Sequence, residues 1–133
     1  YVFMADLLRE LSIGVEVDFV KIRSYDGDSS TGTIKFRKDI SADIDNRHVV
    51  IVEDIIDSGF TINFLVNRLK ESGPKSVSVA TVLYKKKVAK LDFEVDYVGF
   101  VIPPEFVVGY GLDYNEKYRN LKDVMVMEPK DID

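Results

Sequence analysis

One segment near the middle of the chain limits the fold more than any other. Val49–Val52 is continuously apolar and β-branched, which is typical of a strand buried on both faces of a parallel sheet. A short acidic, glycine-containing stretch follows, and then Ile62, Leu65, Val66 and Leu69 repeat the spacing of one helical face. A buried strand that leads directly into a helix predicts an α/β fold, with the connection at the carboxyl edge of the sheet.

Further strands are predicted downstream of this unit. The pattern from Val77 to Leu83 predicts the second strand of a β-α-β unit, and residues 97–101 and 124–127 predict two more short strands. Pro103 and Pro104 force an irregular stretch between these two. We therefore expect a mostly parallel, twisted sheet flanked by helices.

The amino-terminal part of the chain has a different pattern. Apolar residues at helical spacing from Met4 to Leu11 predict a helix that Gly14 ends, with Thr61 expected to cap the later helix. Residues 15–25 and 33–38 then read as two strands. The polar connector between them has the composition of either a mobile surface loop or a functional lid.

Composition sets the broad class. At 133 residues the chain has the length of a single domain, which we place at residues 1–133, and it has no apolar run long enough for a membrane helix. A net charge of −5 argues against a nucleic-acid surface, and the absence of cysteine favours the cytoplasm. Because Tyr1 already lies inside an apolar-periodic segment, we expect that an N-terminal part of the domain is missing.

The connection after the buried strand offers groups that bind an anion. Ser58, Gly59 and Thr61 supply backbone amides and hydroxyls around a helix N-terminus, where a terminal phosphate binds readily. Glu53 and Asp54 stand beside them, and carboxylates accept hydrogen bonds from sugar hydroxyls or from the waters of a metal ion. A ligand with both a phosphate and a sugar diol would use both sets of groups.

A simpler interpretation is that acidic residues only complement the helix dipole, an effect of about 0.3 to 1 kcal/mol each. For Asp57 alone that interpretation suffices. It does not explain the adjacent pair Glu53 and Asp54, because two crowded carboxylates repel one another unless a cation or hydrogen-bond donors intervene. The segment Glu53–Thr61 is therefore predicted to bind a phosphorylated ribose.

The thirteen residues Val49–Thr61 closely resemble the phosphoribosyl-diphosphate motif of type I phosphoribosyltransferases. Further segments match the hypoxanthine-guanine members of that family over essentially the whole chain. These are Ser24-Tyr25, Lys85, Phe106–Tyr110 and Leu112–Arg119. The Lys-Gly loop that grips pyrophosphate in the family normally precedes the position of Tyr1 and is not in this sequence.

The resemblance implies a purine salvage transferase. Such an enzyme moves 5-phosphoribose from phosphoribosyl diphosphate to N9 of hypoxanthine or guanine with Mg²⁺, giving IMP or GMP and pyrophosphate. It also implies a homodimer or a homotetramer. Two alternatives stay open, namely a phosphoribosyltransferase for another base and a regulatory protein of the same fold that senses phosphoribosyl diphosphate without chemistry.

The resemblance also implies roles for single residues around the sugar. Asp57 matches the family's general base for N7 of the purine, with Glu53 and Asp54 beside the reacting ribose. Ser58, Gly59, Phe60 and Thr61 match the residues that bind the ribose phosphate.

A second group of matches concerns the base, the metal and the diphosphate. Lys85 matches the contact to the 6-oxo group, while Phe106 stacks on the base and Val107 hydrogen-bonds its edge. Asp113 matches a carboxylate at the purine and metal site, where Glu53 and Asp54 are further metal candidates, and Arg119 matches the pyrophosphate contact. Ser24 and Tyr25 belong to the expected lid.

Overall fold

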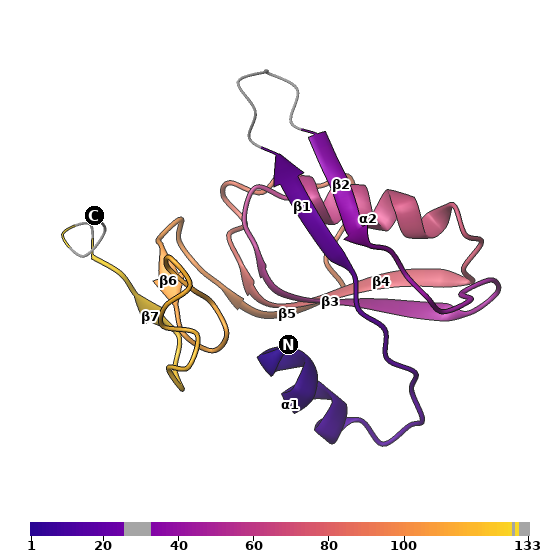
Figure 1. Ribbon diagram of the computed structural model, residues 1–133, viewed down its shortest axis with the longest axis horizontal. Helices are drawn as coiled ribbons and strands as arrows, with labels where there is room; N and C mark the ends of the chain where they lie inside the picture. The colour runs from indigo at the N-terminus through magenta and orange to yellow at the C-terminus, as the bar shows by residue number, and fades with distance from the viewer. Residues whose placement is uncertain (26–32, 129, 131–133) are drawn as a thin grey trace.

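A parallel three-stranded sheet forms the centre of the protein. The computed structural model describes residues 1–25, 33–128 and 130. The sheet consists of β3 (His48–Ile56), β4 (Ser76–Tyr84) and β5 (Tyr97–Val101), which lie side by side in that order (Figure 1). Both pairs of neighbours run parallel. The expected α/β fold with a mostly parallel sheet is confirmed.

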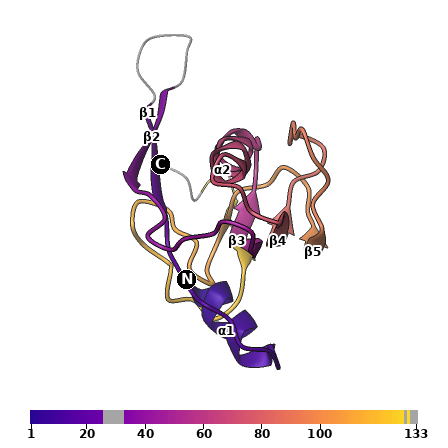
Figure 2. The ribbon, with the colours of Figure 1, turned by 90° about the vertical axis from the view of Figure 1, so that its right-hand side faces the viewer.

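Helices lie on both sides of this sheet. Helix α2 (Phe60–Lys70) connects β3 to β4 and covers one face, while α1 (Val2–Glu10) lies on the other side and contacts β3 (Figure 2). The buried residues of α2 are Ile62, Leu65, Val66 and Leu69, the four that the helical spacing predicted. They pack with Ile44, Ile51, Ile56 and Val79 in one apolar cluster.

A hairpin packs against the outer side of α2. Its strands are β1 (Lys21–Tyr25) and β2 (Thr33–Lys38), which pair antiparallel. The rings of Phe36 in β2 and Phe64 in α2 lie 5.2 Å apart between centroids, which places the hairpin beside α2.

The first of these strands is shorter than its pattern predicts. Residues 15–20 are extended but belong to no strand of the described chain, so the prediction of a strand from residue 15 is wrong there. Side-chain bonds hold this segment in place instead, because the carboxylate of Asp18 accepts hydrogen bonds from the backbone of Ser41 at 2.7 Å and of Ala42 at 3.0 Å. These bonds lower the pKa of Asp18.

Strand β3 differs from its prediction in two ways. It continues through Glu53, Asp54 and Ile55 to Ile56, so the acidic pair belongs to the strand and not to the turn. It is also an edge strand among the described residues, and Val50 is 53% exposed, so burial on both faces is wrong for this residue. Continuous apolar character cannot distinguish a central strand from an edge strand.

The carboxyl-terminal part forms a small third sheet. Strands β6 (Val107–Val108) and β7 (Met125–Val126) pair antiparallel, and β7 is shorter than the predicted strand at 124–127. Between them the chain makes two tight turns closed by reciprocal backbone hydrogen bonds, one joining Gly109 to Leu112 and one joining Tyr114 to Lys117. In the part of the chain that the structure describes, neither helix has the length and apolar character of a membrane span.

The buried face of α2 makes a stability prediction. Leu65 is 3% exposed, and Leu65→Ala leaves a cavity that the rigid sheet fills incompletely. We expect a loss of about 2 to 5 kcal/mol in the free energy of unfolding, measured by urea denaturation. The control Asn67→Ala changes an exposed position on the same helix and should lose little. Equal losses in the two variants would contradict this packing.

Candidate active site

The turn between β3 and α2 depends on a left-handed glycine. Gly59 is the N-cap of α2 with φ 89° and ψ −2°, a conformation that residues with a Cβ rarely adopt. A Cβ at this position would also lie 2.5 Å from Cδ2 of Leu91 and 3.0 Å from the carbonyl oxygen of Lys90. The expected cap Thr61 lies instead in the first helical turn, and no side chain caps the helix.

The carbonyl groups of Ser58 and Gly59 in this turn are engaged, whereas most of the amide groups of the turn are not. Lys90 N–H donates to the Ser58 carbonyl at 2.9 Å, and Asn63 N–H donates to the Gly59 carbonyl at 3.0 Å. Phe60 N–H reaches only the hydroxyl of Ser58, at 3.4 Å. Within the described residues, the amides of Ser58, Gly59 and Thr61 donate to no protein acceptor. The turn therefore presents several free donors at a helix N-terminus, which suits an anion.

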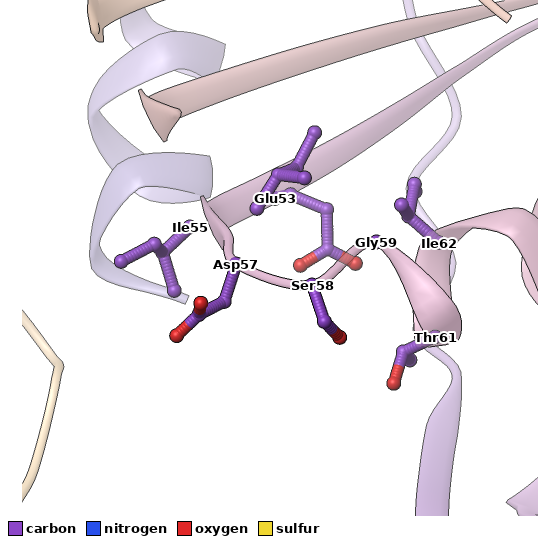
Figure 3. Close-up of a pocket in the computed structure, with 8 residues that line it drawn as sticks. Glu53, Ile55, Asp57, Ser58, Gly59, Thr61 and Ile62 are labelled. Carbon is purple, nitrogen blue, oxygen red and sulfur yellow. The ribbon is translucent and has the colours of Figure 1, made fainter. Parts of the chain in front are cut away.

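A cavity of about 130 Å³ opens above these amides. The side chains of Asp57, Ser58 and Thr61 point to the same side of the turn, and the carboxylate of Glu53 points from the strand toward the turn (Figure 3). Two residues expected here do not line the cavity. Phe60 is 52% exposed, and Asp54 turns to accept a hydrogen bond from the backbone of Ile55. The remaining lining residues are Ile55, Ile56, Gly59 and Ile62.

Glu53 is a carboxyl group without a partner in the described part of the chain. Burial, and to a smaller extent the neighbouring carboxylate of Asp54, raise its pKa to about 7. A ligand that offers hydroxyl donors or a cation would favour the charged form and restore a lower pKa. The raised pKa and the lack of a protein partner are the properties expected of a carboxyl group that binds a polyhydroxylated or metal-bound ligand.

A second cavity of about 150 Å³ adjoins the first, and the two share Ile55 and Asp57. Its other walls come from distant parts of the chain, and these include the four residues expected at the base. The full set of additional lining residues is Lys85, Phe106, Val107, Leu112 and Asp113. Leu112 was not named from the sequence as a residue of this cavity. Ile55 could have been found, because Glu53, Ile55 and Asp57 alternate along the chain and so face one side of an extended strand.

Asp57 forms an ion pair with Lys85 between the two cavities. Lys85 Nζ lies 2.9 Å from Asp57 Oδ2, and the Lys85 side chain is 9% exposed whereas that of Asp57 is 61% exposed. A buried ammonium group needs such a partner. The pair fixes one carboxylate oxygen, while the exposed side of Asp57 stays accessible to a ligand.

Phe106 and Val107 form an apolar wall of the second cavity. The ring of Phe106 packs perpendicular to that of Tyr114, with centroids 5.7 Å apart, and Phe106 remains 43% exposed. Such packing fixes the ring but leaves area for a flat ligand to stack on. Tyr114 lines neither cavity and supports this wall from behind through the ring contact.

Asp113 completes the second cavity, and Arg119 supports it from outside. Arg119 Nη2 lies 3.3 Å from Asp113 Oδ1, and its Nη1 donates to the Gly111 carbonyl at 2.9 Å. Arg119 lines neither cavity. In this structure it therefore holds the loop rather than facing a ligand.

Three acidic residues were expected to hold a metal. Glu53 and Asp113 line different cavities, and Asp54 lines neither, so they form no common cluster. Among the described residues no three Asp, Glu, His or Cys side chains gather as a metal site would need. Mg²⁺ commonly takes only one or two protein carboxylates and fills its shell with water and substrate phosphate oxygens, and Asp113 fits that use.

The lid expectation is only partly covered by the structure. The backbones of Ser24 and Tyr25 lie at the end of β1, paired with Ile34 and Thr33. The connector that follows them, residues 26–32, lies outside the described residues. The lid therefore stays a prediction.

Comparison with known proteins identifies similar sequences. The sequence profile of the phosphoribosyl transferase domain matches residues 1–115. The bifunctional protein TilS/HprT of Listeria monocytogenes is 46% identical over 129 residues, which are 96% of this chain and 20% of that protein. The hypoxanthine-guanine phosphoribosyltransferase of Bacillus subtilis is 43% identical over 128 residues, 96% of this chain and 71% of that one. The chain thus spans about a fifth of the bifunctional relatives.

Solved structures show the same fold. A hypoxanthine phosphoribosyltransferase from Staphylococcus aureus superposes with a TM-score of 0.91 at 40% identity, covering 97% of this chain and 71% of that one. A hypoxanthine-guanine phosphoribosyltransferase from Bacillus anthracis, with a HEPES molecule in its active site, gives 0.89 at 44% identity, over 96% and 75% of the two chains.

The raised pKa of Glu53 makes a pH prediction. Its folded pKa of about 7 lies above the ordinary glutamate value of 4.5, so the folded protein binds this proton more tightly than the unfolded chain. The stability that the neutral carboxyl contributes is complete below the unfolded pKa and is lost as the pH rises through the folded pKa. Glu53→Gln removes this loss, which amounts to roughly 3 kcal/mol across that interval.

Urea unfolding at pH 4.5 and pH 8 in the presence of EDTA measures the effect, with those two pH values chosen to lie near the ends of that interval. The variant should gain stability relative to the parent protein at the higher pH. The exposed control Glu94→Gln should show no such gain. A difference between Glu53→Gln and the parent that does not change with pH would contradict the burial argument.

Proposed function

Because this chain belongs to the phosphoribosyl transferase domain family, we propose that it transfers 5-phosphoribose from phosphoribosyl diphosphate to N9 of hypoxanthine or guanine. The single observation that carries this proposal is that Asp57 lines both cavities, which therefore adjoin at this residue. One cavity has free amides for a phosphate, and the other has a cation and an aromatic ring for a base. A bond between sugar and base would then form where the cavities meet.

The first cavity suits the phosphorylated sugar. The free amides of Ser58, Gly59 and Thr61 offer donors to the 5-phosphate at the helix N-terminus, where the dipole favours negative charge. Glu53 accepts hydrogen bonds from the ribose hydroxyls, and their donation offsets the burial of its charge. The same carboxylate lies near the positive charge that develops on the ribose ring in the transition state.

The second cavity suits a 6-oxopurine. Lys85 donates to the exocyclic oxygen, whereas the amino group of adenine would meet a second donor there. Phe106 stacks on the ring, an interaction of about 1 to 3 kcal/mol on truncation, and the backbone of Val107 is available to the base edge.

Asp57 carries the proton transfer in this proposal. The bond from ribose C1 to the diphosphate oxygen breaks, the bond from C1 to purine N9 forms, and the proton leaves N7 for the carboxylate of Asp57. The ion pair with Lys85 leaves the other side of Asp57 open toward the cavity.

The leaving diphosphate needs positive charge. When bound, Mg²⁺ supplies it, and Asp113 is the carboxylate placed to hold the ion together with substrate oxygens. Arg119, which pairs with Asp113, holds that carboxylate in position and is available to the diphosphate through rotation of its side chain. Ser24 and Tyr25 belong to the segment that would close over the site and exclude water.

We also propose a cellular compartment and an oligomeric state. The chain works in the cytoplasm, consistent with its lack of cysteine. It assembles as a homodimer or a homotetramer, which sedimentation measurements can decide.

The direct test is base consumption by the full-length protein with phosphoribosyl diphosphate and Mg²⁺. Hypoxanthine, guanine, xanthine and adenine are offered in turn. Turnover of hypoxanthine or guanine, with adenine much poorer, is the expected result. Comparable use of adenine would contradict the role of Lys85. Tight binding of phosphoribosyl diphosphate without consumption of any base would contradict the transferase and favour a sensor.

The role of Asp57 makes a separate kinetic prediction. Asp57→Asn keeps the size of the side chain but removes the proton acceptor, so kcat should fall by about 10² to 10⁴. The affinity for phosphoribosyl diphosphate should change little, because the amides that hold its phosphate are intact. The matched control Asp92→Asn alters an exposed carboxylate and should leave both values unchanged. An unchanged kcat in Asp57→Asn would remove this residue from the mechanism.

A further inference from the structure

Tyr110 occupies an unfavourable backbone conformation beside the second cavity. Gly109 and Leu112 exchange backbone hydrogen bonds of 3.0 Å each, with only Tyr110 and Gly111 between them. Their φ angles are 53° and 95°, as a type I′ turn requires. The first position of such a turn normally carries Asn, Asp or Gly, and a bulky residue at positive φ is an outlier. Such strain persists only where other contacts of the residue hold it.

The side chain of Tyr110 supplies that contact. Its hydroxyl donates to Oδ2 of Asp6 in α1 at 2.5 Å, which joins residues 104 positions apart in sequence. This bond raises the pKa of Tyr110, since ionising the phenol would lose it. The start of α1 also rests on the turn, because a Cβ at Gly111 would lie 3.3 Å from Cγ2 of Val2. Helix α1 and the turn are therefore packed together.

The turn leads directly into the wall of the second cavity. Leu112 and Asp113 follow it and line that cavity, whereas neither Tyr110 nor Asp6 lines either cavity. On the other side, Gly111 N–H donates to the Arg119 carbonyl at 3.0 Å. The turn is thus fixed between its own loop and α1, and Tyr110 makes the side-chain bond to the helix.

We propose that the hydrogen bond from Tyr110 to Asp6 positions the base-binding wall, so that both residues are positioning residues for the purine. The bond fixes Leu112 and Asp113 relative to Lys85 and Phe106, which line the same cavity. This inference rests on the proposed function for the identity of the ligand, but the bond and its effect on the loop can be tested without turnover.

A purely structural role would have different consequences. If the bond only stabilised the fold, its loss would lower the unfolding midpoint and reduce the active fraction, which lowers the apparent kcat and leaves KM unchanged. A positioning role instead raises KM for the base and leaves kcat and KM for phosphoribosyl diphosphate unchanged, because the sugar cavity is built from β3 and α2.

The test is Tyr110→Phe, which keeps the ring and removes the hydroxyl. Because the lost bond ends on a carboxylate, we expect KM for hypoxanthine or guanine to rise by roughly tenfold. Asp6→Ala should match it, and the double variant should add little further, as coupled partners do in a double-mutant cycle. Asp6→Asn, whose amide oxygen still accepts, should restore most of the affinity. The matched control is Tyr97→Phe, on an exposed position of β5, with no expected change.

Hydrogen exchange in the free protein gives a second readout. Tyr110→Phe should speed exchange in residues 106–116 and leave β3 and β4 protected. An unchanged KM for the base together with unchanged exchange would overturn the proposal, as would additive effects of Tyr110→Phe and Asp6→Ala. If the parent protein consumes no base, the proposed function fails, while the exchange experiment still decides whether the bond positions this wall.

Discussion

The left-handed conformation of Gly59 is the constraint on which the rest of the site depends. It follows the end of β3 at Ile56 and starts α2, while the carbonyls of Ser58 and Gly59 accept hydrogen bonds from the backbone amides of Lys90 and Asn63. No side chain caps the helix, so its N-terminal donors remain available. The apolar face of α2, packed on the sheet, holds this arrangement rigid. An anion can bind here without the site having to reorganise.

The alternation of side chains along an extended strand then decides which residues meet the ligand. Glu53, Ile55 and Asp57 face the cavities, whereas the carboxylate of Asp54 bonds its own neighbour and faces neither. Asp57 is the last of the series, and it lines both the first and the second cavity. The proximity of Lys85 follows from the parallel pairing of β3 with β4, which brings the carboxyl ends of both strands to one edge of the sheet.

Local patterns predicted most of the fold and named most of the residues that line the two cavities. The stripe on α2, the β-α-β unit and the segment Glu53–Thr61 could be recognised because helical spacing and strand composition are local properties. Asp54 lines neither cavity, and the alternation of side chains along the strand could have indicated this. The prediction of residues 15–20 as a strand was wrong, because the pairing partner of a strand depends on distant residues. The same limit hid the two turns near Asp113 and the bond from Tyr110 to Asp6, whose partners lie at opposite ends of the sequence.

The central claim is that the amides between residues 58 and 61 hold a phosphate esterified to a sugar. Titration of ¹⁵N-labelled protein with ribose 5-phosphate, followed by amide NMR, tests it most directly. The account predicts saturable shifts at Ser58, Gly59 and Thr61, with no comparable shifts when ribose alone is added. If ribose 5-phosphate left these three amides unchanged, or shifted only residues outside this turn, the account would be contradicted.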